Sequence, residues 1–157
     1  MSVNIIIRNE STRKRLYRRD VLQRLAERIL SGEGKLDETE LSVLFCDDEY
    51  MSELNGHYRK VKGPTDVLSF ECEEVPGVSP APLGDIVISL ETVEQHCAGN
   101  TPLMRDEVKL LICHGVLHLL GYDHGTRKEK DEMQSLQSSY LGVDSEEAWN
   151  FGSRVVV

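Results

Sequence analysis

The stretch HGVLHLLGYDH, residues 114–124, holds three of the five histidines in this chain of 157 residues. The stretch LLICHGVLHLL, residues 110–120, is apolar on every side, which is typical of a helix packed in a protein core. His114 and His118 are four residues apart, so they lie one turn apart on the same helical face. Buried imidazoles need polar partners, and this pair therefore requires an explanation.

A bound metal ion is the explanation that we favour over a pair of core histidines with an unrelated surface histidine. Gly121 can adopt a left-handed conformation, end the helix and turn the chain back, which would bring His124 to the other two rings. Three neutral imidazoles suit Zn²⁺ with a fourth position left open for water, as in catalytic sites. Cys113 adjoins His114, but adjacent helical residues point about 100° apart, so we do not expect the thiol to bind the same ion.

The chemistry of the site depends on Gly115. The spacing H-x-x-x-H-x-x-G-x-x-H is that of extended zinc-protease motifs, in which a glutamate follows the first histidine and takes a proton from the zinc-bound water. Glycine costs a helix about 1 kcal/mol relative to alanine, so we expect a neighbouring group to approach the backbone closely here. Without that glutamate a phosphodiester suits the site, because its charged oxygens need neutralising and positioning more than a dedicated proton acceptor.

Composition indicates one soluble globular domain over residues 1–157, with 39% hydrophobic and 29% charged residues. The four scattered cysteines, Cys46, Cys72, Cys97 and Cys113, form no C-x-x-C pair and predict buried thiols in a reducing compartment, here the cytoplasm. We expect no membrane span and no signal peptide, because the longest apolar run is short and the N-terminus lacks a basic region and a cleavage site.

The net charge of −9 argues at first against a nucleic-acid ligand. Screening, however, limits the reach of each charge to about 8–10 Å, so a local basic patch can bind phosphate on an acidic protein. Residues 1–30 are locally basic, and a second cluster contains Arg59, Lys60 and Lys62. For the first cluster the sequence favours a solvated amphipathic helix over a binding patch.

The pattern of the chain predicts an α+β domain with a mixed sheet of about four strands and a buried central helix that carries His114 and His118. Caps are expected at Asp20, at Thr101, which precedes a proline, and at the capping box from Thr126 to Glu129. We predict strands at 3–7, 40–47, 65–72 and 84–89, helices at 20–30, 47–56, 90–98, 101–120 and 126–142, and a Pro/Gly loop at 73–84.

The histidine motif, with LNGHYRKVKGPTDVLSF at 54–70 and GDIVIS at 84–89, resembles the YbeY family of bacterial rRNA-maturation endoribonucleases nearly from end to end. The resemblance implies a zincin-like fold and one zinc ion bound by His114, His118 and His124. It also implies cleavage of single-stranded RNA in ribosomal RNA maturation, notably at the small-subunit 3′ end, and in ribosome quality control. A small-subunit ribosomal protein and a maturation GTPase are the partners that it suggests.

Arg59 falls on the family's arginine, and we interpret it as a phosphate clamp rather than a surface salt bridge, with Lys60 and Lys62 as further RNA contacts. Asp85 and Asp66 are candidates for the general base or for support of the metal ligands, although the residues alone favour turn capping for both.

Two details near the site stay open. Asp123 could close the turn before His124 or orient a ligand ring. Glu71 stands where many relatives have proline, which adds negative charge beside the expected RNA path.

Two other functions also remain open. One is a zinc hydrolase for a peptide or small amide, against which the missing glutamate weighs. The other is a ribosome-assembly factor whose zinc is mainly structural. Histidine sites also admit Ni, Co or Cu, and we expect a monomer.

Overall fold

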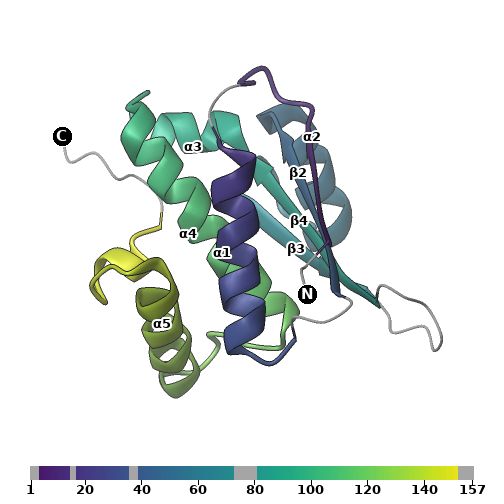
Figure 1. Ribbon diagram of the computed structural model, residues 1–157. Helices are drawn as coiled ribbons and strands as arrows, with labels where there is room; N and C mark the ends of the chain where they lie inside the picture. The colour runs from purple at the N-terminus through teal and green to yellow at the C-terminus, as the bar shows by residue number, and fades with distance from the viewer. Residues whose placement is uncertain (1–3, 15–16, 36–38, 73–80, 152–157) are drawn as a thin grey trace.

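Figure 1 shows the computed structural model, which describes residues 4–14, 17–35, 39–72 and 81–151. The four strands form one mixed sheet in the order β1-β2-β4-β3, in which β1, β2 and β4 are parallel and β3 runs antiparallel at the edge. This confirms the predicted sheet. The strands are β1 (Asn4–Asn9), β2 (Thr39–Cys46), β3 (Val67–Glu71) and β4 (Ala81–Ser89). Residues 73–80 of the predicted loop at 73–84 lie outside the described residues. Its last four residues, 81–84, belong to β4.

Five helices were predicted, and the structure has α1 (Arg19–Gly32), α2 (Asp48–Leu54), α3 (Leu90–His96), α4 (Thr101–Leu119) and α5 (Arg127–Leu141). Helix α2 does not end near Gly56 as expected. It continues as a π-helical turn, η1 (Asn55–Arg59), up to Lys60 in a left-handed conformation. A 3₁₀ turn that was not predicted, η2 (Glu147–Trp149), follows α5.

Of the three predicted helix caps, the structure confirms the one at α5 and corrects those at α4 and α1. The capping box of α5 is confirmed, with Thr126 and Glu129 each bonding the other's backbone N–H. The cap of α4 is not Thr101 but Asn100, whose side-chain oxygen accepts from Leu103 N at 3.1 Å. Asparagine is at least as good a cap as threonine, and it shifts the start by one residue. Asp20 lies inside the first turn of α1 rather than capping it.

The sheet has two apolar faces because alternate strand residues point to opposite sides. One face, which includes Val43 and Ile86, packs against α1 and α4 in the main core. The other face includes Leu44 and Val87 and is covered by Met51 of α2. Helix α4 is therefore enclosed by the sheet and by α1, and its predicted place at the centre of the core is confirmed.

Close packing between α4 and β4 accounts for Gly115. A Cβ atom at this position would lie 2.9 Å from Cδ1 and 3.1 Å from Cγ1 of Ile86, a fully buried side chain. Position 115 therefore faces the sheet, and a side chain there would require the Ile86 side chain to shift.

Three of the four cysteines, Cys46, Cys97 and Cys113, are buried free thiols as predicted, whereas Cys72 is exposed. None of the helices in the described part of the chain is long and apolar enough to cross a membrane.

We expect Gly115→Ala to lower the free energy of unfolding of the metal-free protein by about 1 kcal/mol. Overpacking a core costs about 1–3 kcal/mol, of which alanine's higher helix propensity offsets about 1 kcal/mol. In an Ile86→Val background, which lacks the Cδ1 atom, the same substitution should cost less. Urea unfolding of all four proteins measures both costs. Equal costs in the two backgrounds would contradict the steric explanation.

Candidate metal centre

The last turn of α4 brings two imidazoles together, with His118 Nε2 lying 3.0 Å from His114 Nε2. Gly121, at φ +102°, then reverses the chain, and its N–H bonds the carbonyl oxygen of His118 at 3.0 Å. His124 follows this turn, and the ligand atoms of the three histidines all lie within 4.8 Å of one another. The structure thus brings together the three residues that the motif predicted as metal ligands.

The turn that carries His124 is anchored from outside the motif. The Tyr122 hydroxyl donates to Oε1 of Glu33 at 2.6 Å, and the other oxygen of this carboxylate accepts from the Tyr140 hydroxyl. Glu33 follows α1 and Tyr140 belongs to α5, so both helices fix the turn. Asp123 accepts from the backbone N–H of His124 at 2.8 Å, and the first of its two proposed roles, closing the turn, is therefore observed.

His114 is only 8% exposed, and burial lowers the pKa of its imidazole to about 4. Burial also lowers the pKa of His118. Nδ1 of His114 lies 2.9 Å from Oε1 of Gln137, an oxygen that can only accept, so Nδ1 carries the proton. The Gln137 amide is itself oriented, since its Nε2 donates to the carbonyl oxygen of Ala148 at 2.6 Å. Nε2 of His114 therefore keeps its lone pair for a metal ion.

This donor set fits a zinc ion. Two imidazole nitrogens bound to one tetrahedral zinc at about 2.0–2.1 Å are about 3.3 Å apart, close to the His114–His118 separation. A carbonyl-type acceptor behind a ligand histidine is also the usual way in which such rings are held. Cys113 does not join the cluster, and burial raises the pKa of its thiol to about 12.

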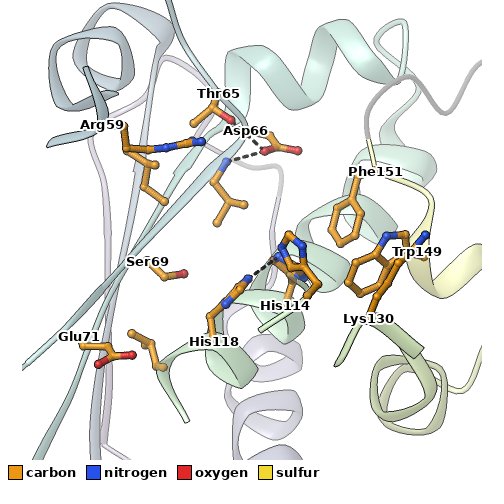
Figure 2. Close-up of a pocket in the computed structure, with 14 residues that line it drawn as sticks. Arg59, Thr65, Asp66, Ser69, Glu71, His114, His118, Lys130, Trp149 and Phe151 are labelled. Carbon is orange, nitrogen blue, oxygen red and sulfur yellow. Dashed lines mark hydrogen bonds between the residues drawn. The ribbon is translucent and has the colours of Figure 1, made fainter. Parts of the chain in front are cut away.

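The histidines lie in a cleft of about 660 Å³ between the edge strand β3 and the segment that follows α5 (Figure 2). Val67, Ser69 and Glu71 line it from β3, and Arg59 lines it from η1. On the other side of the histidines, the cleft is bounded by Lys130 of α5 and by two aromatic residues, Trp149 and Phe151.

Comparison with known proteins shows to which family this chain belongs. Residues 6–143 match the family model described as endoribonuclease YbeY. The chain belongs to the YbeY family. It is 41% identical to the endoribonuclease YbeY of Pelotomaculum thermopropionicum over 126 residues, which cover 78% of this chain and 83% of the relative. It is 45% identical to that of Aquifex aeolicus over 120 residues, which cover 76% and 79%. The solution structure of TM1509 from Thermotoga maritima aligns with a TM-score of 0.59 at 28% identity, covering 94% of this chain and 89% of that one.

Of the three basic residues that we expected to contact RNA, only Arg59 lines the cleft. Lys60 and Lys62 are exposed outside it. Asp66 also lines the cleft, and its Oδ1 accepts from Val67 N at 2.8 Å and from the Thr65 hydroxyl at 3.4 Å. This is the capping arrangement that the residues alone favoured, and it sets the start of β3.

Asp85 does not fit its predicted role beside the metal. It pairs with Phe70 across β3 and β4, whereas its neighbour Ile86 faces α4. Because successive strand residues point to opposite faces, the carboxylate of Asp85 is exposed on the side of the sheet away from the histidines. The sequence places Asp85 in a family motif, but it does not show which face of the sheet is covered by α4, the helix that carries His114 and His118.

Several residues of the basic N-terminal cluster form ion pairs within the protein. Arg13 binds Glu94 at 2.7 Å and Asp47 at 3.3 Å, and Arg18 and Arg24 both lie 3.2 Å from Asp20. Helix α1 buries one apolar face and leaves its charged face in solvent, which confirms the amphipathic-helix interpretation.

Four residues of the site were missed at the level of sequence: Gln137, Lys130, Trp149 and Phe151. Gln137 is 23 residues from its partner His114, and no local spacing connects them. The only signal for Trp149 was that it is the single tryptophan of the chain.

We expect Gln137→Leu to weaken metal binding by about 10- to 100-fold, because it removes the acceptor that holds the ring of His114. Competition with a chromophoric chelator measures the affinity, and circular dichroism checks the fold. Gln134→Leu is the matched control, since Gln134 lies on the same helix and donates to Ser145 O at 2.5 Å without reaching a histidine. Equal metal affinities for the two variants would refute a special role for Gln137.

Proposed function

We propose that this chain is a zinc-dependent endoribonuclease that cuts single-stranded RNA, with His114, His118 and His124 as the metal ligands. The observation that carries the proposal is the convergence of three imidazoles in a cleft that Arg59 also lines, in a member of the endoribonuclease YbeY family. By the family resemblance its substrate is ribosomal RNA, notably the small-subunit 3′ end, and it also acts in ribosome quality control. It works as a monomer in the cytoplasm, with the small ribosomal subunit and a maturation GTPase as partners.

The ion, when bound, would supply a Lewis acid for a phosphate oxygen and lower the pKa of water. The protein supplies the rest. Arg59 is always charged, and its planar guanidinium can bind two phosphate oxygens at once. The low pKa of His114 keeps its ring neutral, so this ligand does not have to lose a proton when the metal binds.

The missing glutamate of the zinc-protease motif also supports a phosphodiester substrate. Position 115 faces Ile86 in the packed interface between α4 and β4, so a glutamate at this position would have to displace the Ile86 side chain. The carboxylates that line the cleft are Asp66 and Glu71. Asp66 is engaged at the start of β3, and we assign it a positioning role.

The test is cleavage of a labelled single-stranded rRNA fragment, beside its duplex form, with the metal content assayed for each protein sample. We expect wild type to cut the single strand, and His118→Ala to lose both metal and cleavage. Arg59→Ala should keep its metal and lose about 100-fold in kcat/KM, because it removes a cation that stabilises charge in the transition state.

Arg24→Ala is the charge-matched control, because Arg24 is exposed on α1 and lies outside the cleft; its activity should equal that of wild type. Equal cleavage by all four proteins would mean a contaminating nuclease. A protein that binds RNA without cutting it, but unfolds when the metal is removed, would favour an assembly factor with structural zinc. Turnover of peptides with RNA left intact would favour a zinc hydrolase of another class.

A further inference from the structure

Two aromatic side chains from the segment after α5, Trp149 and Phe151, form a wall directly against the candidate metal ligands. The ring of Trp149 lies 5.6 Å from that of His114 and 5.5 Å from that of His124, centroid to centroid. Phe151 lies 4.7 Å from His114 and 5.2 Å from Trp149. Both aromatic residues are half-buried and line the cleft, so part of each ring faces the space that a substrate would enter.

Holding the histidines in place does not account for this wall. His114 is already oriented by Gln137, and the turn before His124 is anchored by Asp123 and by Tyr122. Trp149 and Phe151 also follow residue 143, where the match to the family model ends. The aromatic wall is thus a feature of the cleft that the metal centre itself does not require.

Hydrogen bonds through Gln137 link the aromatic wall to His114. The carbonyl of Ala148, next to Trp149, accepts from the Gln137 amide whose other end bonds His114. Asp144 accepts from the backbone N–H of Glu147 at 2.8 Å at the start of the same turn. A platform fixed in this way contacts a ligand without losing much conformational freedom on binding.

A cation accompanies the aromatic rings. The ammonium of Lys130 lies 5.8 Å from the centre of the Trp149 ring, and Lys130 also lines the cleft. In Figure 2 this cation and the wall lie on the other side of the histidines from Arg59. The flat face of the Trp149 indole beside a positive charge complements the two parts of a nucleotide, its base and its phosphate.

We propose that Trp149 and Phe151 form a nucleobase subsite, in which a base next to the cut phosphodiester lies against the indole while Lys130 binds a neighbouring phosphate. This inference rests on the proposed function, because it takes RNA as the substrate. It adds that one unpaired base is needed at a fixed position beside the cut. Aromatic–base contacts of this kind change affinity by roughly tenfold or more per base.

The test uses short single-stranded RNA oligonucleotides in which one base at a time is replaced by an abasic ribose. Because Trp149 is the only tryptophan, the fluorescence of the zinc-loaded protein, excited selectively at tryptophan so that the five tyrosines do not contribute, reports on this wall. We expect intact RNA to quench it, and removal of the base at one position to abolish the quenching and lower kcat/KM about tenfold. In Trp149→Ala, intact and abasic RNA should be cut at the same reduced rate with metal content unchanged.

Tyr50→Ala is the matched control, since Tyr50 is an exposed aromatic residue outside the cleft, and it should keep the full abasic effect. RNA that is cut with equal efficiency whatever base is missing would overturn the subsite and leave the endoribonuclease function standing. Loss of metal from Trp149→Ala would also overturn it, since the wall would then serve the ligands. If wild type neither binds nor cuts RNA, the subsite fails together with the proposed function. Should Trp149→Ala not fold, the quenching by abasic RNA still decides.

Discussion

The hydrogen bond between His114 and Gln137 is the interaction on which the site depends. His114 is buried on a helix packed inside an apolar core, where an unpartnered imidazole would be costly. Gln137 satisfies the ring, fixes which nitrogen carries the proton and, through its other end, holds the chain at Ala148. One fully buried amide therefore couples the metal ligand to α5 and to the aromatic side of the cleft.

The edge position of β3 determines the other side of the cleft. A strand in the middle of the sheet would have neighbours on both sides, whereas among the described residues β3 pairs with β4 alone, and its residues also line the cleft. The π-helical continuation of α2 brings Arg59 to the same space, and the Asn55 side chain bonds the carbonyl of Gly63 at 2.9 Å to hold the following loop. The candidate metal ligands and Arg59, the proposed phosphate clamp, thus come from different elements that border the same cleft.

The features that the sequence predicted correctly are those encoded by local spacing. The i, i+4 histidines, the glycine turn after them and the capping box of α5 each depend on residues within a few positions of one another. Partners that are distant in sequence were missed, as with Gln137 and His114, or Glu33 and Tyr122. The misplacement of Asp85 has a related cause, because strand alternation gives two faces but only tertiary packing decides which one meets α4. Gly115 shows the intermediate case, in which a close approach was predicted and the approaching group, Ile86, was not.

Charge explains how an acidic protein could still bind RNA. The net charge is −9, and Arg13, Arg18 and Arg24 lie beside carboxylates, so part of the positive charge of the N-terminal region is neutralised within the protein. Because salt screens charges beyond about 8–10 Å, a phosphate is attracted mainly by the cations close to it. In the cleft these cations are Arg59 and Lys130. Only a strand that enters the cleft gains from both. A duplex keeps its bases stacked inside, so it could bring phosphates to the cations but could not offer a base to Trp149. In our proposal, a preference for single-stranded RNA comes from the shape and the chemistry of the cleft rather than from overall charge.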